Sequence, residues 1–555
     1  MTAPPARAGR ASLATRLGGR PAGIALAGIL ALAAALRLAA IGYDLPFFYD
    51  PDEWVFIFRA GRILATGDPD PGWYGHPGQF TIYLNALVFA GLALAALVTG
   101  AVDGAGEVVA WFEQDRSAFV LAGRLVVAAF SVAIVALSAG LSRRLGGGAG
   151  TVALAALLVA IAPLLVDFGF LIRPDNQMTV FALLAVLAAV RLATAPRPGL
   201  YLAAGAALGV AVSCKYPAVV FAVAIVAAHA FAEEGRVWRR AHRLAAAGAA
   251  SLAACFVTAP FLFLEFGAVL ADVGHEARDY HLSAASAGPL SALAWYGRTV
   301  FLPAGGPLGL ALFCVAAAGA VARRDRVRRD GARGVVVVAA LAYLAFIVSL
   351  PLQWERWLIP LLPLYLVVVA LGAGDVARAA AARWRARRRA GVGVMVGLGL
   401  LLVAPTGWIT AGDLVAELRG QTRTETWRYL MEEVPQGSRL LMERYTAQPP
   451  RGRFALFEVD EAGAIVPVDG PERFAVPQGV TGRLPPGGAV AAIEAAEIDY
   501  LVLGDDYARR KAEPARHADA VAVYETLLDR YPTVFATEPR RWVRAGRENR
   551  VLRVE

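Results

Sequence analysis

Three carboxylates, Asp50, Asp52 and Glu53, fall within four positions directly after the first long apolar segment of this 555-residue chain. One explanation is structural, because Asp50 can cap a helix, Pro51 suits the first helical position and Glu53 can complete a capping box. Capping does not explain the basic residues nearby, since Arg59 and a second arginine one turn later follow on the same amphipathic segment. The stretch therefore has two interpretations, a helix start and one wall of a charged site.

The short polar segments between later apolar runs carry further charged side chains. Arg173 and Asp175 stand in one segment, Lys215 in the next, and Arg356 lies among tryptophans in another. Acids and bases that converge from separate loops on one membrane face are expected of a site for a phosphorylated ligand whose tail stays in lipid. Structural alternatives remain open: an ion pair or helix cap for Asp175, an interfacial anchor for Arg356 and a snorkelling side chain for Lys215.

Composition places these loops on a membrane protein. The chain is 57% hydrophobic and 18% charged, and its apolar residues are gathered into repeated long runs. The net charge of +9 comes from arginines beside these runs, which is a topology signal rather than a nucleic-acid signal. The three cysteines lie far apart, so they predict neither a disulfide framework nor a metal site.

Arginine-rich connectors predict the topology, because such loops stay in the cytoplasm. One apolar run, 80–99, does not fit this count, since a crossing there would move Arg143 and Arg144 to the outside. We therefore expect 80–99 to be a re-entrant or interfacial segment of the outer leaflet. About eleven transmembrane helices result, over residues 22–41, 119–141, 151–167, 176–194, 200–213, 217–232, 244–264, 307–322, 334–350, 358–373 and 391–410. Arg37, inside the first span, is expected to snorkel or to pair with an acid of the first loop.

The predicted architecture is an all-α polytopic membrane domain followed by a small soluble α/β domain. It divides into a cytoplasmic tail (1–21), a transmembrane domain (22–410) with outer loops 42–118 and 265–306, and an extracytoplasmic domain (411–555). Alternating patterns in the last domain predict strands at 439–442, 454–459 and 500–504 and helices at 424–434 and 518–531. Segment 498–504 is expected to be the buried central strand.

Four motifs, in this order, resemble those of the GT-C membrane glycosyltransferases. The most similar branch is the protein O-mannosyltransferase and lipid A aminoarabinose transferase superfamily, and the resemblance covers roughly residues 20–410 by order and spacing. The motifs are Pro51-Asp52-Glu53, Arg173-Pro174-Asp175, Lys215-Tyr216 and Arg356-Trp357-Leu358-Ile359-Pro360. The resemblance implies a GT-C fold with juxtamembrane helices in the outer leaflet, which would account for residues 80–99.

The resemblance also implies a reaction, namely transfer of a sugar from a polyprenyl-phosphate-linked donor to an extracytoplasmic acceptor hydroxyl, with inversion at the anomeric carbon. Asp52 would be the general base of the Asp52-Glu53 catalytic pair. Cations would bind the leaving phosphate, the candidates being Lys215, Arg356, Arg59 and Arg173. Candidates for sugar or acceptor contact are Asp175, Asp50 and His76, although His76 could equally shape its loop. The acceptor could be a protein, a lipid or a glycan.

The implied setting is a bacterial-type cytoplasmic membrane, with the N-terminus inside and the C-terminal domain outside. No metal or other cofactor is predicted; a divalent-metal site at His275 and His281, with Glu276 and Asp279, is less favoured than a solvated helix because the spacing is scattered. Two other classes remain as alternatives. A secondary transporter would place its ionisable residues near the middle of the bilayer, and a noncatalytic scaffold or sensor would use the soluble domain as its functional part.

Overall fold

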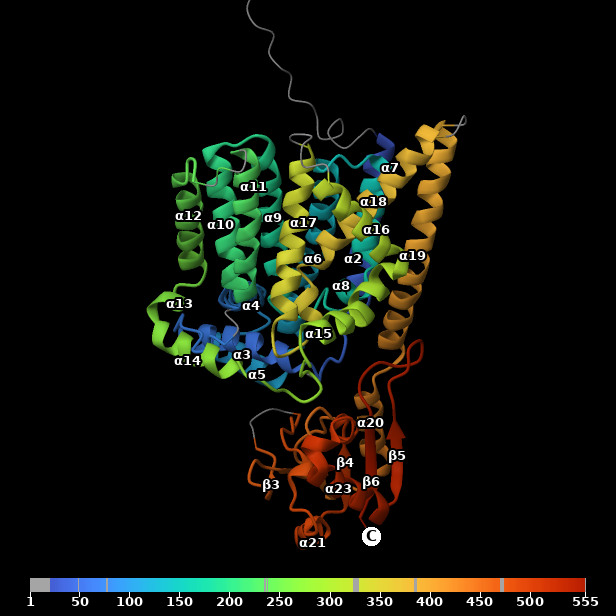
Figure 1. Cartoon of the computed structure of the whole chain (residues 1–555). Helices are drawn as coiled ribbons and strands as arrows, with labels where there is room; N and C mark the ends of the chain where they lie inside the picture. Colours follow the sequence, from blue (N-terminus) through green and yellow to red (C-terminus); the bar gives the residue numbers. More distant parts are fainter. Residues whose placement is uncertain are drawn as a thin grey trace, which may run out of the picture.

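The computed structural model describes residues 20–47, 49–75, 78–233, 236, 238–322, 329–383, 387–469 and 474–554. Long helices stand side by side in a bundle, and a smaller domain with a β-sheet lies beyond one end of it (Figure 1). We refer to this end as the domain-facing end. The bundle helices are α2 (Arg20–Ala39), α6 (Ser117–Arg144), α7 (Ala149–Ile161), α9 (Asp175–Thr194), α10 (Pro198–Cys214), α11 (Ala222–Ala232), α12 (His242–Thr258), α16 (Leu302–Ala322), α17 (Arg329–Val348), α18 (Leu362–Arg383) and α19 (Arg387–Arg419).

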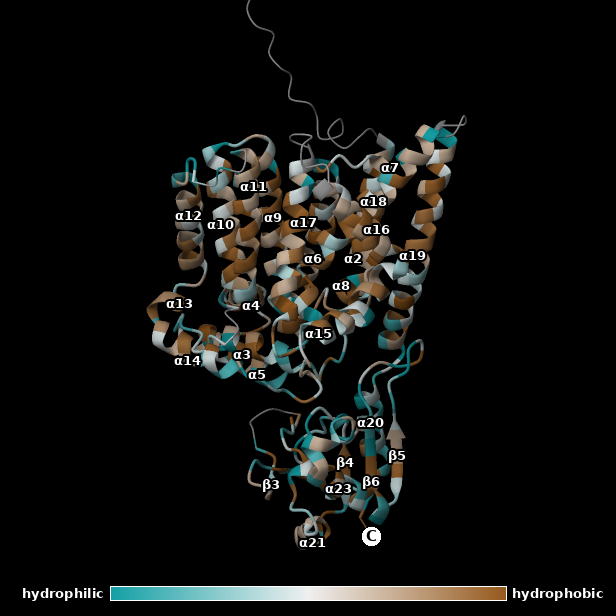
Figure 2. Cartoon of the chain, in the orientation of Figure 1, coloured by the Kyte–Doolittle hydropathy of each residue, from teal (hydrophilic) through white to brown (hydrophobic). Residues whose placement is uncertain are grey.

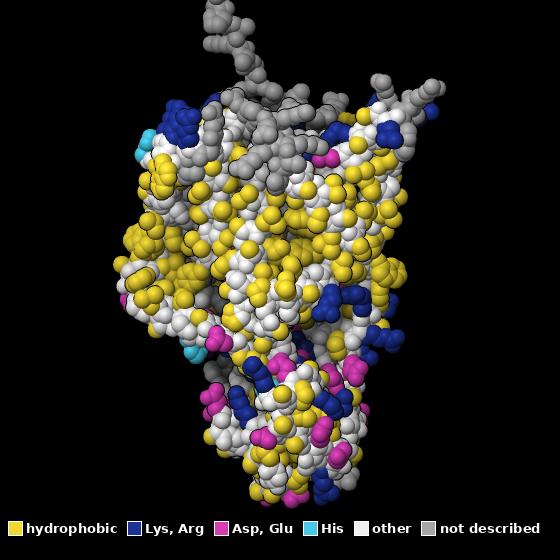
Figure 3. Space-filling model, viewed as in Figure 1, with side chains coloured by type: hydrophobic (Ala, Val, Ile, Leu, Met, Phe, Trp, Pro, Cys, Tyr) yellow, Lys and Arg dark blue, Asp and Glu magenta, His cyan; other side chains and the backbone are white. Residues whose placement is uncertain are grey.

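The bundle is apolar along most of its length, and its polar residues gather at its two ends (Figure 2). In the space-filling view hydrophobic side chains surround the bundle, whereas charged side chains gather at its two ends and on the smaller domain (Figure 3). Within the described ranges, eight helical runs are long and apolar enough to cross a membrane, and three apolar helices are shorter. The chain is therefore an integral membrane protein, as its composition predicts.

The shorter apolar helices fall where the sequence predicts spans. They are Ala149–Ile161, Pro198–Cys214 and Tyr216–Ala232, against the predicted ranges 151–167, 200–213 and 217–232. The first is continued by a separate short helix, α8 (Pro163–Asp167), and the third begins as the 3₁₀ turn η1 (Tyr216–Phe221). Prolines at these breaks cannot donate a backbone hydrogen bond, which explains why the helices are interrupted.

Small residues allow neighbouring helices to approach closely. Gly205 and Gly209 of α10 face α12, and a Cβ atom at either glycine would lie 2.0 Å from the carbonyl oxygen of Ala247 or Ser251. Helices in lipid have no hydrophobic driving force for association, so the close van der Waals packing of such GxxxG contacts stabilises the helix pair instead. An alanine at either position would force α10 and α12 apart.

Several shorter helices lie across the domain-facing end, as Figure 1 shows for α3, α5 and α14. They are α3 (Pro51–Thr66), α5 (Ala105–Gln114), α13 (Phe261–Leu264), α14 (Phe266–Glu276), α15 (Pro289–Tyr296) and the turns η2 (Gly297–Phe301) and η3 (Glu355–Leu358). Asp50 caps α3, because its Oδ1 accepts hydrogen bonds from the backbone amides of Asp52 and Glu53. The capping interpretation of this stretch is thus part of its structure.

The run predicted not to cross the membrane forms α4 (Gln79–Val98). By length and composition alone it could span a bilayer. However, its buried residues Ile82, Ala86 and Phe89 pack in one cluster with α3 residues and with Phe119 and Val120 at the start of α6. Its middle therefore contacts elements of the domain-facing end, and the interfacial placement stays a prediction that agrees with this packing.

The expectation for Arg37 is wrong. Its side chain is 0% exposed, so it does not snorkel. The guanidinium donates to Ser131 Oγ (2.9 Å) and to the backbone oxygens of Ala160 (2.6 Å) and Leu165 (3.2 Å). These carbonyls border the break between α7 and α8, where helical hydrogen bonding is interrupted, so Arg37 satisfies freed backbone acceptors in the bundle.

The C-terminal domain contains a six-stranded sheet of order β3-β2-β1-β4-β6-β5. The strands β1, β2 and β4 run parallel and the other pairings are antiparallel. The central strand β4 was predicted correctly: Leu501 and Leu503 pack on the side of α23, and Val502 packs on the side of α20. The elements are β1 (Arg439–Met442), β2 (Ala455–Val459), β3 (Ile465–Pro467), β4 (Tyr500–Leu503), β5 (Thr533–Thr537), β6 (Asn549–Arg553), α20 (Thr422–Glu433), η4 (Thr481–Arg483), α21 (Ala489–Ala495), α22 (Asp506–Lys511) and α23 (Pro514–Arg530).

The boundary between the two parts differs from the predicted one. The sequence predicts that the last span ends at residue 410, but α19 continues to Arg419 and α20 follows almost directly. Arg423, at the start of α20, donates to the backbone oxygen of Tyr49 (3.0 Å). The C-terminal domain is thus held against the segment that precedes α3.

Candidate active site

A cavity of about 620 Å³ lies where the domain-facing end meets the C-terminal domain. Within the described ranges its lining contains eight arginine and lysine side chains but four acids, which makes it strongly basic. Its charged residues come from nine separate segments of the chain. They are Asp50, Asp52, Arg173, Asp175, Lys215, Glu276, Arg278, Arg356, Arg423, Arg444, Arg509 and Arg547.

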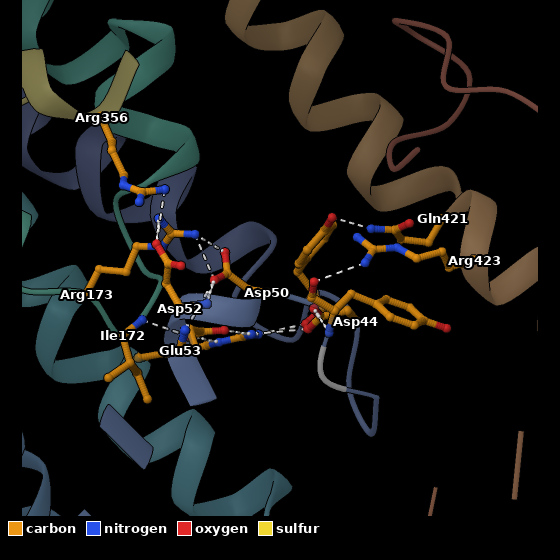
Figure 4. Close-up of polar contacts among 12 residues, drawn as sticks. Asp44, Asp50, Asp52, Glu53, Ile172, Arg173, Arg356, Gln421 and Arg423 are labelled. Atoms are coloured by element: carbon orange, nitrogen blue, oxygen red, sulfur yellow. Dashed lines mark hydrogen bonds and ion pairs between the residues drawn. The ribbon is translucent and has the colours of Figure 1, made fainter. Parts of the chain in front are cut away.

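Asp52 projects from the first turn of α3 between two guanidinium groups, as Figure 4 shows. Its Oδ2 lies 2.8 Å from Nη1 of Arg173 and 3.0 Å from Nη1 of Arg356. The side chain is 33% exposed, the largest exposure among the acids of these ion pairs at the start of α3. Asp52 is therefore held in place by cations and is still open to a ligand.

Arg173 is held more firmly by acidic side chains than Arg356 is. It contacts both carboxylate oxygens of Asp50, at 2.7 and 2.6 Å, in addition to Asp52. Burial alone would lower the pKa of Arg173, but Asp50 and Asp52 raise it above its ordinary value, so the group stays charged. Arg356 is more exposed, and its guanidinium stacks over the ring of Trp354 at 4.9 Å.

A second ion pair joins Lys215 to Asp175, with Nζ and Oδ1 2.8 Å apart. Both side chains are less than a tenth exposed. Burial lowers the pKa of Lys215, and Asp175 acts in the opposite direction. Asp175 is also the first residue of α9, where a carboxylate is favoured by the helix dipole.

Glu53, predicted as part of the catalytic pair, does not line the cavity. It is 2% exposed, and its oxygens accept hydrogen bonds from Arg124 Nε (3.1 Å), Arg124 Nη2 (2.6 Å) and the amide of Ile172 (2.7 Å). Arg124 also contacts Asp44 at 3.1 Å. Burial raises the pKa of Asp44 to about 7, against the opposing effect of Arg124. This buried network fixes α3 to α6 and to the loop before Arg173 (Figure 4).

Two other predicted residues are not part of the described cavity. Arg59 is absent from the described lining. Its guanidinium lies beside Gly72, and its position on α3 is nearly two turns beyond that of Asp52. The helical period explains this, because residues seven apart repeat the same face but at a different height. His76 lies outside the described residues. The remaining predicted residues, Asp50, Asp52, Arg173, Asp175, Lys215 and Arg356, line one cavity.

Sequence reasoning missed the arginines contributed by the C-terminal domain and the outer loop. These are Arg278, Arg423, Arg444, Arg509 and Arg547. The available signal was the position of Arg423 directly after the last apolar helix; the other four are scattered among many arginines. Arg124 was also missed, although a charged residue inside an apolar span indicates a buried partner.

No group of three or more histidine, cysteine or acidic side chains in the described segments could hold a metal ion. His281 lines the cavity, with its ring 4.9 Å from that of Trp354, and its Nδ1 contacts the oxygen of Leu282. His275 belongs to α14 and is not part of the described lining.

Comparison with known proteins agrees with the resemblance stated above. Residues 116–263 match the family model described as dolichyl-phosphate-mannose-protein mannosyltransferase. No curated protein matches the sequence. Apo ArnT from Cupriavidus metallidurans is 15% identical, with a TM-score of 0.48, over 96% of this chain and 98% of that chain.

Two further solved structures show similar values. ArnT from the same organism bound to undecaprenyl phosphate is 15% identical over 96% of this chain and 97% of that chain, with a TM-score of 0.47. AglB from Archaeoglobus fulgidus, an archaeal oligosaccharyltransferase in complex with an inhibitory peptide and a dolichol-phosphate, is 13% identical over 95% and 74%, with a TM-score of 0.48.

The family match confirms the predicted resemblance to the protein O-mannosyltransferase-like superfamily of GT-C proteins. The description of this family names mannosyl transfer from a lipid-linked donor, dolichyl-phosphate-mannose. The matched segment includes Arg173, Asp175 and Lys215 but not Asp52 or Arg356.

Proposed function

We propose that this protein transfers a sugar from a polyprenyl-phosphate-linked donor to an acceptor hydroxyl, with inversion at the anomeric carbon. The observation that carries the proposal is that Asp52, an accessible carboxylate, shares one basic cavity with Lys215 and Arg356. An inverting displacement needs a base on one side of the sugar and cations around the leaving phosphate on the other. The cavity contains both kinds of group at the end of apolar helices, where a lipid phosphate would lie.

Asp52 is the proposed general base. The acceptor oxygen attacks the anomeric carbon while its proton passes to a carboxylate oxygen of Asp52. The bond between the anomeric carbon and the phosphate oxygen breaks, and its electron pair stays on the phosphate, whose charge changes from −1 to −2 as the diester becomes a monoester. General base catalysis of this kind contributes roughly 10²–10⁴-fold to the rate.

Arg356 and Lys215 are the proposed ligands of the departing phosphate. Arg356 forms an ion pair with Asp52, the one it makes among the described residues, and a guanidinium can pair with phosphate through two parallel hydrogen bonds. Lys215 adds a compact positive charge whose desolvation in the pocket strengthens its attraction to an anion. We assign Arg173 a positioning role, because Asp50 and Asp52 occupy its guanidinium.

Glu53 and Arg124 are further positioning residues of the site. Their buried ion pair fixes the start of α3, and with it the backbone of Asp52, to α6. We further propose that the domain-facing end lies on the non-cytoplasmic side of a bacterial-type cytoplasmic membrane, with residues 42–118 as one outer loop. The arginine-rich connectors at the opposite end of the helices support this orientation.

The test is the Asp52→Asn variant, assayed in membranes with radiolabelled polyprenyl phosphate sugars. We expect transfer to fall at least ~100-fold with little loss of folded protein, because the asparagine amide cannot accept the acceptor proton. Asp68→Asn is the matched control, since Asp68 forms an exposed ion pair with Arg62 in the same loop but does not line the cavity. Near-normal transfer by Asp52→Asn would reject Asp52 as the base.

A further inference from the structure

A second cavity, of about 390 Å³, adjoins the first one. The two share four lining residues, Tyr49, Pro51, Arg423 and Tyr445. The second cavity lies between one side of α3 and the C-terminal domain, and it opens beside the Asp50–Asp52 turn. Its other lining residues are Trp54, Phe58, Thr446, Gln448, Asp469, Val476, Pro477 and Gln478.

The chemistry of this second cavity differs from that of the first. Its described lining contains one arginine and one acid, Arg423 and Asp469, so their charges balance. The first cavity has eight basic side chains to four acids. A cavity without excess positive charge is poorly suited to a phosphate and well suited to a neutral polar molecule.

One wall of the second cavity is aromatic and rigid. Trp54 and Phe58, one helical turn apart on α3, stack with their ring centroids 4.6 Å apart and 12° between their planes. Arg116 lies over the Phe58 ring at 4.5 Å. Tyr49 is 3% exposed and is covered by the guanidinium of Arg423 at 4.2 Å. These rings are therefore fixed before any ligand arrives, which reduces the entropic cost of binding.

The opposite wall offers hydrogen-bonding side chains from the C-terminal domain. Thr446 and Gln448 are nearly buried, whereas Asp469 and Gln478 are exposed. The loop that carries Gln478 is held by Glu458, whose Oε2 accepts from the amides of Gln478 (2.5 Å) and Gly479 (2.8 Å). The amides of Gln448 and Gln478 can donate to and accept from sugar hydroxyls, and the Asp469 carboxylate can accept from them.

Tyr445 stands at the junction of the two cavities in an unusual backbone conformation. Its φ is +61°, in the left-handed region that bulky residues rarely adopt. Arg547 lies over its ring at 4.7 Å and Arg444 at 5.4 Å. Strain of this kind persists where the surroundings enforce it, and it is concentrated at ligand-binding sites.

We propose that the second cavity is an acceptor subsite that binds carbohydrate. This inference rests on the proposed function and specifies the class of acceptor as a glycan or the glycan part of a glycolipid. The apolar C–H faces of a sugar ring pack on aromatic rings, whose faces carry partial negative charge, while its hydroxyls pair with amides and carboxylates. A sugar bound between Trp54 and Gln478 would direct its terminal hydroxyl past Tyr445 toward Asp52.

The test uses the full-length protein in detergent and a panel of soluble trisaccharides, including mannotriose and N,N′,N″-triacetylchitotriose, observed by saturation-transfer NMR. One variant is Tyr445→Ala, at a partly exposed residue. The other is the double change Asp469→Ala with Gln478→Ala; both of these side chains are exposed, so their removal should not prevent folding. Glu461→Gln, an exposed acid of the same domain outside the cavity, is the matched control. Binding of undecaprenyl phosphate is measured in parallel on every variant.

We expect at least one trisaccharide to bind, and its affinity to fall about 10-fold or more in both cavity variants but not in the control. Undecaprenyl phosphate binding should be unchanged in the double variant, because Asp469 and Gln478 do not belong to the described lining of the first cavity. Failure of every trisaccharide to bind, binding that the cavity variants leave intact, or preferential binding of a serine- and threonine-rich peptide would overturn the inference. Failure of the unmodified protein to bind undecaprenyl phosphate would instead contradict the proposed function.

Discussion

Replacing Glu53 by glutamine removes the negative charge that holds Arg124 inside the protein. Three donors point at the Glu53 carboxylate: Arg124 Nε (3.1 Å), Arg124 Nη2 (2.6 Å) and the amide of Ile172 (2.7 Å). A glutamine has one acceptor oxygen, so its NH₂ group would face at least one of these donors. A hydrogen bond to a charged group contributes about 1.5–3 kcal/mol, and an unsatisfied buried donor costs about 1–3 kcal/mol more.

Asp44 remains as a second counter-ion at 3.1 Å from Arg124, which limits the damage. We therefore expect the free energy of unfolding of Glu53→Gln to fall by about 3–5 kcal/mol, the range for breaking a buried ion pair. The measurement is an unfolding titration of the purified protein in mixed micelles, followed by far-ultraviolet circular dichroism. The matched variant is Asp52→Asn, whose partly exposed ion pairs predict a loss below about 1 kcal/mol.

Substitution of these two neighbouring acids should thus affect different properties of the protein. Asp52→Asn should fold normally and lose transfer, whereas the folded fraction of Glu53→Gln should retain transfer. A Glu53→Gln protein as stable as the unmodified one, within about 0.5 kcal/mol, would refute the assignment of Glu53 to a positioning network. A stable but inactive Glu53→Gln protein would indicate a direct role in chemistry.

Three further outcomes are expected. Arg356→Met and Lys215→Met should each weaken undecaprenyl phosphate binding about 10-fold, measured by competition with a labelled lipid phosphate, whereas Arg59→Met should bind normally; equal effects in all three would contradict the assigned cavity. Burial and Arg510 lower the pKa of His517, so the neutral imidazole favours its contact with Tyr280. As the pH falls through this lowered pKa, the contact should weaken and hydrogen exchange of residues 277–284 should accelerate. The same pH dependence in His517→Gln would contradict this prediction. A cysteine replacing Ala101, in a protein lacking Cys314, should react with an impermeant thiol reagent from the non-cytoplasmic side, and reaction only after lysis would reverse the proposed orientation.

Much of the fold follows from local sequence signals. Long apolar runs bounded by arginines predicted the bundle helices, and β1 was predicted at its observed residues because a short apolar run fits a strand buried on both faces. The strands β3, β5 and β6 were not predicted. Two of them, β3 and β5, are sheet edges with exposed residues and lack a clear apolar alternation. The end of α19 was misplaced because polarity, not helical structure, changes near residue 410.

The candidate site was only partly readable. The acids of α3 and the cations Lys215 and Arg356 were predictable because each is isolated in a short polar segment between apolar runs. The distinct roles of Asp52 and Glu53 were not, since adjacent helix positions point about 100° apart and only the packing of α6 decides which side is buried. The prediction for Arg37 failed because its partners are Ser131 and backbone carbonyls rather than an acid, and backbone carbonyls leave no mark in the sequence.

The close connection of α19 to α20 places the C-terminal domain against the proposed active site, where its residues form part of the cavity lining. Tyr43 and Tyr49 precede the first turn of α3, and they contact Gln421 and Arg423 immediately after the last bundle helix. Removing the C-terminal domain would leave the bundle helices in place, but it would open the cavity on the side that this domain covers. A relative with a different C-terminal domain would keep the proposed donor-binding residues of the bundle, yet it would present a different surface to the acceptor.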